Sequence, residues 1–355
     1  MTPVDVAVVG GGASGLAAAF ELQRRGIRFA LLEAAPRLGG VIRTDHVDGF
    51  TLDAGPDSLL TQKPAAIQLC EELDLSNQLI STLEPRTAYV LRNGLRPIPE
   101  ASMLGIPTAI TPWITSTLLS PRAKLRMASE IFRPRGDATQ ESVGQFFRRR
   151  FGHRTVDQIA EPLLAGIHAG DVEQLSVAAL FPRLVEAERS HGSVILGLRD
   201  LRKHTPKLRE GLFRSLPGGL EELVRTLSEK LPSSTVHRSS QVLDLTGPSP
   251  YVLQIQHARR LAARSIILAT PAHVTATLVS RLDTQLESLC REIPYTSTAT
   301  VLLAYPRLAI QRPVLGSGFV VSRLERSVAL LAGSWVTSKW PGRAPPWPGG
   351  RLWWR

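Results

Sequence analysis

A glycine-rich turn between an apolar strand and a helix is the feature that most constrains this chain. The run Gly10–Gly15 has the pattern G-x-G-x-x-G, and it follows the apolar segment Val4–Gly10 directly. The next residues, Ala13–Arg25, predict a helix, and Arg28–Glu33 predicts a second buried strand. These elements form a β-α-β unit, so the predicted fold class is α/β with a parallel sheet and a Rossmann-like nucleotide site.

Each glycine of the turn has a physical role. Gly10 permits the tight turn, Gly12 lets the backbone approach a pyrophosphate, and Gly15 lets the helix pack closely on the strand. The pyrophosphate would lie at the helix N-terminus, where unpaired N–H groups and the helix dipole favour an anion. The residues of this predicted nucleotide site are Gly10, Gly11, Gly12, Ala13, Ser14 and Gly15.

A carboxylate and two arginines follow this turn. Glu33 ends the second predicted strand, where it can accept hydrogen bonds from ribose hydroxyls and would repel a 2′-phosphate. The pattern Glu33-x-x-x-Arg37-x-Gly39-Gly40-x-x-Arg43 comes next, and a plain NAD dehydrogenase needs no such segment. Its glycines permit close backbone approach and its arginines can neutralise a diphosphate. Ordinary turn glycines beside surface arginines are the alternative interpretation.

Composition excludes several other classes of protein. The 355 residues suggest about two domains. Two cysteines far apart, Cys70 and Cys290, exclude a disulfide framework and a cysteine-based metal cluster. The eight histidines have no metal-ligand spacing, and His168 is expected to be structural. No acid–base pair stands out, so no catalytic residue is assigned. The net charge of +11 comes without a nucleic-acid-binding motif.

The segment Ala101–Pro121 is apolar and uncharged but interrupted by prolines, so it is not expected to span a membrane. Nine Lys and Arg residues follow between Arg122 and Arg154, against three acidic residues. We expect a cytoplasmic protein in peripheral contact with anionic lipid at the inner face of the cytoplasmic membrane. The alternative is a buried segment that faces a substrate cavity, and a solvated helical face or a surface for an anionic substrate also explains the charge.

Further elements are expected along the chain. Extended segments are predicted at Leu52–Ser58, Ala88–Arg92, Val236–His237, Val242–Leu245, Val252–Gln256, Ser265–Ala269 and Thr298–Ala304. Helices are predicted at Pro64–Leu73, Ser142–Phe151, Val156–Leu164, Val177–Ser190 and Glu221–Leu231, and in part of Thr275–Glu292.

The glycine turn followed by Glu33, Arg37, Gly39-Gly40 and Arg43 resembles the flavin amine oxidase superfamily, which includes monoamine oxidases, carotenoid desaturases and protoporphyrinogen oxidases. Later segments are similar to protoporphyrinogen/coproporphyrinogen oxidases in particular. They are Phe50–Ser58, Leu104–Pro107, Glu161–Asp171, Leu175-Ser176, Phe181-Pro182 and the stretch from Trp335 to Pro341.

This resemblance implies a Rossmann-like FAD-binding domain interleaved with a mixed-sheet substrate domain and a helical insertion. The implied boundaries are 1–85 and 213–275 for the FAD domain, 86–99 and 276–340 for the substrate domain, 100–212 for the helical, membrane-contacting insertion, and 341–355 for an aberrant tail. Beyond the glycine turn, the expected FAD contacts are Glu33, Ala34, Arg37, Gly39, Gly40, Val41, Arg43, Gly55, Pro56, Asp57, Ser58 and Val242.

The implied reaction is the oxidation of a porphyrinogen to the porphyrin in haem biosynthesis, with FAD as cofactor and molecular oxygen as electron acceptor. The sequence does not choose between protoporphyrinogen IX and coproporphyrinogen III. Another enzyme of the superfamily (an amine oxidase or a carotenoid desaturase) and an inactive shortened copy are the alternatives.

The chain end departs from this resemblance. From Trp340 onward, four tryptophans alternate with prolines, which fits neither a core strand nor an amphipathic helix. We expect a truncated or frameshifted C-terminus, which would reduce FAD binding; an unusual intact end is the alternative.

Overall fold

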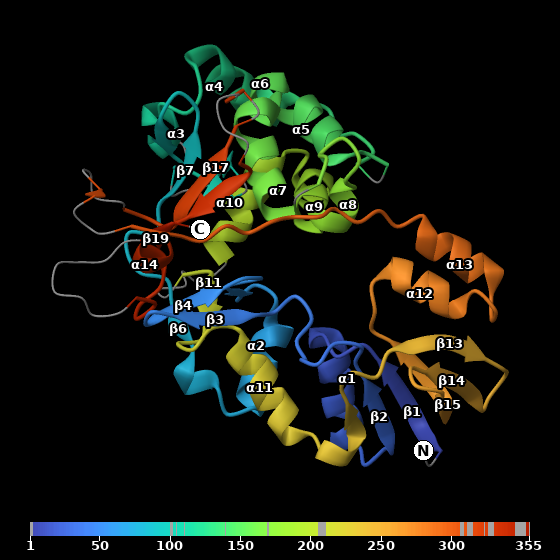
Figure 1. The fold of residues 1–355 in the computed structure, drawn as a ribbon. Helices are drawn as coiled ribbons and strands as arrows, with labels where there is room; N and C mark the ends of the chain where they lie inside the picture. The colour runs from blue at the N-terminus through green and yellow to red at the C-terminus, as the bar shows by residue number, and fades with distance from the viewer. Residues whose placement is uncertain are drawn as a thin grey trace. The chain divides into compact units, whose positions relative to one another are not determined.

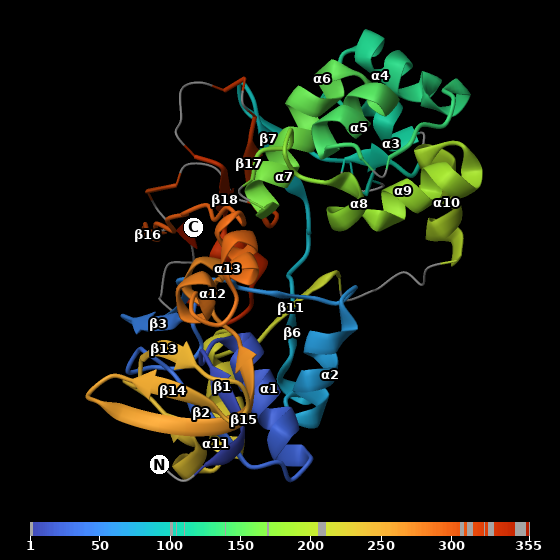
Figure 2. The ribbon, with the colours of Figure 1, turned by 90° about the vertical axis from the view of Figure 1, so that its right-hand side faces the viewer.

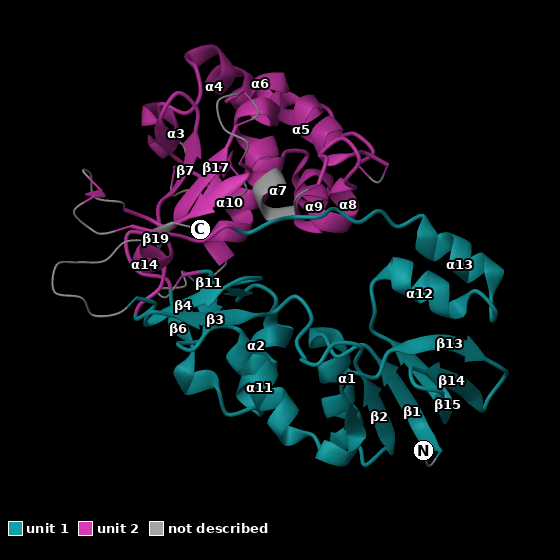
Figure 3. Ribbon diagram, viewed as in Figure 1, with its two compact units in different colours: residues 1–81, 212–300, 342–345 teal, residues 82–211, 301–341, 346–355 magenta. Residues whose placement is uncertain are grey.

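The computed structural model describes residues 3–355 except 100–101, 104, 110, 139, 169, 205–210, 306–308, 311–314, 323, 326–329, 345–352 and 355. The chain divides into two compact units, which Figure 3 colours separately. Unit 1 comprises Met1–Ser81, Leu212–Thr300 and Gly342–Pro345; unit 2 comprises Thr82–Gly211, Val301–Pro341 and Pro346–Arg355. Because this division reflects packing alone, the assignment of chain segments to cofactor and substrate domains stays a prediction.

A six-stranded sheet forms the centre of unit 1. In spatial order its strands are β12 (Val236–His237), β2 (Phe29–Leu32), β1 (Val4–Val9), β15 (Arg259–Leu268), β14 (Tyr251–Ile255) and β13 (Val242–Thr246). The first four strands are parallel, whereas β14 and β13 are antiparallel additions to β15. Helix α1 (Ala13–Arg24) connects β1 to β2, so the predicted β-α-β unit is confirmed (Figure 1).

The two faces of this sheet are covered by different elements. The other helices of unit 1 are α2 (Pro64–Glu72), η1 (Ser76–Gln78), α11 (Glu221–Lys230), η4 (Ser233–Thr235), α12 (Ala272–Val279) and α13 (Thr284–Arg291). Val8 and Leu31 pack in a cluster with buried residues of α1, α2 and α11. Their neighbours Ala7 and Ala30 point the other way, into a cluster with β13–β15 and Leu278 of α12. This alternation is the period of two that a strand buried on both faces requires.

Small strands complete unit 1. The hairpin β3 (Thr44–Val47) and β4 (Phe50–Asp53) follows the first β-α-β unit. A three-stranded sheet has the order β5 (Leu59–Leu60), β11 (Phe213–Ser215) and β6 (Ile80–Ser81). In this sheet β6, where the chain leaves unit 1, pairs with β11, where the chain returns to it.

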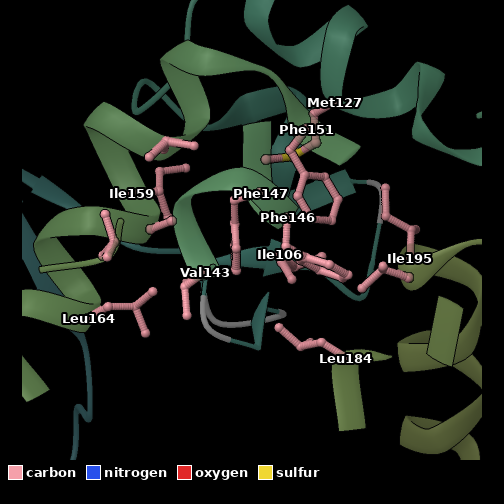
Figure 4. Packing of buried hydrophobic residues seen from close by; sticks show 14 of the residues in the cluster. Ile106, Met127, Val143, Phe146, Phe147, Phe151, Ile159, Leu164, Leu184 and Ile195 are labelled. Carbon is pink, nitrogen blue, oxygen red and sulfur yellow. The ribbon is translucent and has the colours of Figure 1, made fainter. Parts of the chain in front are cut away.

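Unit 2 is mainly helical. Its helices are α3 (Thr111–Thr115), α4 (Pro121–Ala128), η2 (Ser129–Phe132), α5 (Val143–Phe151), α6 (His153–Thr155), the π-helix η3 (Val156–Ala160), α7 (Glu161–His168), α8 (Val177–Leu180), α9 (Pro182–His191), α10 (Val194–His204) and α14 (Val336–Lys339). Figure 4 shows Phe146, Phe147 and Phe151 of α5 at the centre of its core, with Ile106 and Leu184 packed around them. Figure 2 shows α10 beside α9.

The strands of unit 2 form one four-stranded sheet and two pairs. The sheet has the order β18 (Ala332–Ser334), β17 (Gly318–Val321), β7 (Ala88–Leu91) and β8 (Leu95–Pro97), and the pairs are β9 (Ser102–Met103) with β10 (Ile106–Pro107) and β16 (Leu303–Ala304) with β19 (Trp353–Trp354). The rest of the expected tail, 345–352 and 355, lies outside the described residues.

Two local predictions need correction, and one predicted strand is present but longer than expected. The helix expected over Val177–Ser190 is interrupted between α8 and α9, because Pro182 cannot donate a hydrogen bond to the preceding turn. The strand expected over Thr298–Ala304 is present only as β16, since most of the segment has no paired neighbour among the described residues. The strand expected at Ser265–Ala269 is the end of the much longer β15.

Two opposite charges are fully buried in unit 2. The side chains of Glu130 and Arg150 are both 0% exposed, and Arg150 Nε donates to Glu130 Oε1 at 2.7 Å. The Glu130 carboxylate also accepts from Ser193 Oγ at 2.5 Å and from the Val194 N–H at 2.8 Å, at the start of α10. One buried carboxylate therefore joins η2, α5 and the N-terminus of α10.

A second ion pair lies beside the first. Arg149 donates to Glu141 Oε2 at 2.6 Å and to Glu188 Oε1 at 2.7 Å. The hydrogen bond with Glu141 makes the largest contribution to raising the pKa of Arg149. Burial alone would raise the pKa of Glu188, but the hydrogen bonds and charges of its partners lower it below its usual value. Both side chains are thus held in their charged forms.

The apolar segment before α4 is divided between core and surface. Ile106, Trp113, Leu118 and Leu119 are buried in the core of unit 2, whereas Ile114 is largely exposed. Among the described residues, none of the helices combines the length and the apolar character that crossing a bilayer demands.

Candidate functional site

The glycine turn lies where β1 ends and α1 begins. Gly10 has a φ of +106°, and a Cβ there would lie 2.6 Å from the carbonyl oxygen of Ala269. A Cβ at Gly15 would lie 1.8 Å from the Gly10 oxygen, so these two positions require glycine for the turn itself. Gly12 differs, because the nearest atom to its Cβ position is Gly40 Cα at 4.0 Å. The protein leaves space above Gly12.

The N-terminus of α1 opens at this space. Gly12 is the N-cap residue and offers no side-chain cap, and its carbonyl accepts from the Leu16 N–H at 2.9 Å. The N–H groups of Ala13, Ser14 and Gly15 form the first turn, where a helix provides no carbonyl partners. An uncapped helix start beside open space fits a diphosphate.

Glu33 follows β2 and is held against the glycine turn. Its Oε2 accepts from the Gly11 N–H at 2.6 Å, and its Oε1 accepts from the Ala35 N–H at 2.7 Å. Two backbone bonds fix the carboxylate, and a carboxylate has further lone pairs with which to accept from hydroxyl groups. The Glu33 N–H donates to the His237 oxygen at 2.9 Å. Burial, and after it the charge of Arg259, lowers the pKa of the His237 side chain, so His237 adds no positive charge beside Glu33 near pH 7.

The segment after Glu33 folds over the glycine turn. The Gly39 N–H donates to the Gly11 oxygen at 2.8 Å, and a bridge joins Gly39 to Gly12. Arg37 donates to the carbonyls of Leu38 and Ile42 at 3.2 and 3.0 Å, and also to that of Gly40. Its guanidinium therefore orders this loop and places a positive charge on the segment that faces Gly12.

The remaining predicted contacts of this loop are exposed. Arg43 pairs with Asp45 at 2.9 Å on the surface, and Ala34 is exposed. Val41 is 80% exposed. An exposed apolar side chain here is suited to contact with a cofactor.

The turn after β4 packs against Val41. A Cβ at Gly55 would lie 1.9 Å from the Val41 oxygen, so only glycine allows this approach. Pro56 is exposed, and Ser58 Oγ donates to Asp57 Oδ1 at 2.9 Å. The structure thus brings Gly55–Ser58 beside the Glu33–Arg43 loop, although the two segments are separated by a hairpin.

Val242 lies at the start of β13, at the far side of the sheet. Its side chain is largely buried in the core cluster with β1 and β2. A ligand could reach it only through its backbone or its small exposed surface.

Sequence reasoning missed how Thr44 and Asp53 connect this site to α11. Asp53 Oδ1 accepts from Thr44 Oγ1 at 2.6 Å and from the Leu220 N–H at 3.0 Å. Thr44 Oγ1 accepts in turn from the Glu221 N–H at 3.2 Å. Two residues of the β3–β4 hairpin therefore cap α11, a helix that begins far along the chain, and no local pattern signals such a cap.

Other kinds of site find little support. In the described parts of the chain, no group of three His, Cys, Asp or Glu side chains is arranged for a metal ion. Burial raises the pKa of Cys70 to about 11, so this thiol is not a nucleophile near neutral pH. The side chain of His168 lies outside the described residues.

The chain is similar in sequence and in fold to known flavoproteins and porphyrinogen oxidases. The family model for flavin containing amine oxidoreductases matches residues 13–352. The coproporphyrinogen III oxidase of Bacillus subtilis is 34% identical over 96% of this chain and 74% of its own length. The protoporphyrinogen oxidase 2 of Arabidopsis thaliana is 32% identical over 68% of this chain and 50% of its own length. A crystal structure from Exiguobacterium sp. 255-15 has a TM-score of 0.84 and 31% identity, over 100% of this chain and 77% of that one.

The fold and the site therefore define a flavin-dependent oxidoreductase. The chain belongs to the flavin containing amine oxidoreductase family, which the family match and the relatives show together. Its cofactor is FAD, since the dinucleotide site described above and the family's flavin point to the same molecule.

Proposed function

We propose that the chain catalyses the oxidation of a porphyrinogen to the porphyrin in haem biosynthesis, with molecular oxygen as electron acceptor. The observation that carries this proposal is the similarity over 96% of the chain to a coproporphyrinogen III oxidase. Relatives named for both coproporphyrinogen and protoporphyrinogen oxidation are found at similar identity, so the substrate is stated as a porphyrinogen of either kind.

The proposed FAD contacts belong to three segments of unit 1 and one strand start. The first turn of α1 and the space above Gly12 hold the diphosphate, and Glu33 accepts from the ribose hydroxyls. The segments Arg37–Arg43 and Gly55–Ser58 enclose the cofactor, and Val242 lies at the adenine end. When bound, the flavin accepts hydride from the substrate; the protein's part is to hold and orient the two rings and to exclude water.

The expected result of an activity assay is fluorescent porphyrin formed faster than by autoxidation. Full-length protein loaded with FAD is incubated with protoporphyrinogen IX or coproporphyrinogen III, and porphyrin fluorescence and oxygen uptake are followed. The faster substrate identifies the preference. Because the cofactor must be bound, the Gly12→Val variant serves as the matched control and should fall to the autoxidation rate.

Two outcomes would contradict this proposal. Rates equal to autoxidation with FAD demonstrably bound would point to an inactive member of the family. Turnover of amines, with no turnover of porphyrinogens, would favour an amine oxidase.

A second proposal concerns peripheral membrane contact. Three exposed apolar residues, Ile114, Leu125 and Phe132, are 67, 74 and 84% exposed on α3, α4 and η2. Lys124 Nζ donates to the Ile114 oxygen at 2.6 Å, which links α3 to α4. Exposed arginines, including Arg122, flank them. Apolar side chains among cations are suited to one leaflet of an anionic membrane.

Flotation with vesicles tests this contact. Anionic vesicles at low salt should carry the protein upward, whereas neutral vesicles or high salt should release it. Leu125→Glu with Phe132→Glu should abolish flotation, and Leu289→Glu, at an exposed leucine of α13 in unit 1, should leave it unchanged. Wild-type protein that stays at the bottom with anionic vesicles at low salt would rule the proposal out.

A further inference from the structure

A buried ion pair connects the β3–β4 hairpin to a residue near the chain end. Arg343 and Asp53 have side chains that are 1% and 3% exposed, and Arg343 Nη1 lies 3.1 Å from Asp53 Oδ2. Arg343 Nη2 also donates to Ser215 Oγ and to the Leu216 oxygen, both at 2.8 Å. In addition, the Thr51 N–H donates to the Arg343 oxygen at 3.2 Å. The side chain and the backbone of Arg343 are therefore both bonded to other segments of unit 1.

The two oxygens of Asp53 have separate tasks. Oδ1 caps α11 through Leu220 and Thr44, as described above, while Oδ2 faces Arg343. Both oxygens of the Asp53 carboxylate therefore act as acceptors, and the Arg343 guanidinium compensates its negative charge. Three segments that are distant in sequence meet at this one side chain.

Stability alone does not account for this pair. Burial lowers the pKa of Arg343, against the opposing effect of nearby acids, Asp53 first among them. Arg343 Nε has no hydrogen-bond partner among the described residues, although it is buried. A well-packed apolar pair would avoid these desolvation costs, and buried ion pairs are in several cases retained for structural specificity.

Arg343 holds both ends of the turn that precedes β5. At one end it pairs directly with Asp53. At the other end, Ser215 Oγ accepts from Arg343 and donates to the Asp57 oxygen at 2.8 Å. Gly55 and Pro56 lie between these two points, in the turn that also packs against Val41.

We propose that Arg343 is a positioning residue for FAD: through Asp53 and Ser215 it fixes both ends of the turn that faces the cofactor. This inference rests on the FAD site of the proposed function. Removing the guanidinium takes away the donor that orients the Ser215 hydroxyl towards the Asp57 oxygen and leaves Asp53 without its counter-charge, so the cofactor surface loses its fixed shape.

The test compares FAD binding with stability. FAD titration of full-length Arg343→Met should give a Kd at least about tenfold above wild type. The visible absorption band of its bound flavin should also lose fine structure. Arg343→Lys keeps the charge and should restore part of the affinity, because an ammonium group can pair with Asp53 but cannot reach every partner of the guanidinium.

The double variant Asp53→Asn with Arg343→Met separates positioning from folding. Removing both charges should return thermal stability towards wild type, while the FAD Kd stays high because the Ser215 hydroxyl still lacks the donor that orients it. Arg149→Met, which breaks an ion pair in unit 2, is the matched control: it should lower stability and leave the FAD Kd unchanged.

Two results would overturn this inference while leaving the proposed function intact. One is an Arg343→Met protein with wild-type FAD affinity and spectrum. The other is a double variant whose affinity recovers together with its stability, since Arg343 would then act on the fold alone. A wild-type protein that binds no FAD would instead overturn the cofactor site and this inference together.

Discussion

Replacing Gly12 with valine is expected to abolish FAD binding and to leave the fold intact. The Cβ position at Gly12 has no neighbour closer than 4.0 Å, and its φ of −71° suits any residue, so the protein itself accepts the side chain. The added methyl groups would occupy the space assigned to the diphosphate. We expect the FAD Kd to rise by about a hundredfold or more, which corresponds to about 2.8 kcal/mol.

Titration of full-length protein with FAD, followed by flavin fluorescence, measures this loss, and far-UV circular dichroism checks the fold. Gly15→Val is the contrasting variant: its Cβ would lie 1.8 Å from the Gly10 oxygen, so both binding and the local fold should be lost. Gly12→Val protein that retains wild-type affinity would show that the diphosphate does not lie above Gly12.

The cofactor turn could be predicted because its signals are local. Strand, glycine turn and helix follow one another within Val4–Arg24. Gly10 and Gly15 allow close approach to nearby backbone atoms, and Gly12 leaves open space beside the helix start. The resemblance extended this to Glu33 and Gly55, whose contacts with Gly11 and Val41 the structure shows. Whether these residues contact FAD stays a prediction.

Contacts between distant segments could not be predicted in this way. Asp53 stood within a recognised motif, but nothing in the sequence indicates that Leu220 and Arg343 are its partners. The expected strand at Thr298–Ala304 failed for the related reason that apolar, β-branched composition does not supply a neighbouring strand. Pairing between remote segments depends on the tertiary fold, which short patterns do not encode.

Substituting Glu130 with glutamine should destabilise unit 2 by up to about 3–5 kcal/mol. Glutamine has nearly the same shape and can still accept from the Val194 N–H, but it removes the nearer of the two carboxylates that compensate Arg150. Among the described residues, the fully buried guanidinium would keep only Glu188 as a counter-ion, 3.3 Å from its Nη1, and Arg149 shares that carboxylate. Removing one partner of a buried charge is more destabilising than losing an ion pair in water, where the surrounding solvent replaces the lost partner.

Urea denaturation, followed by tryptophan fluorescence and circular dichroism, measures this loss on the full chain. Glu186→Gln is the matched control: the Glu186–Arg189 pair has a 2.6 Å separation but lies on the surface of α9, so its loss should change stability by at most about 1 kcal/mol. Adding Arg150→Met to Glu130→Gln should recover part of the stability, because the incompletely compensated guanidinium is then absent and Glu188 keeps Arg149 as its partner. If Glu130→Gln were as stable as Glu186→Gln, the prediction would be wrong, and Glu188 alone would be sufficient to compensate Arg150.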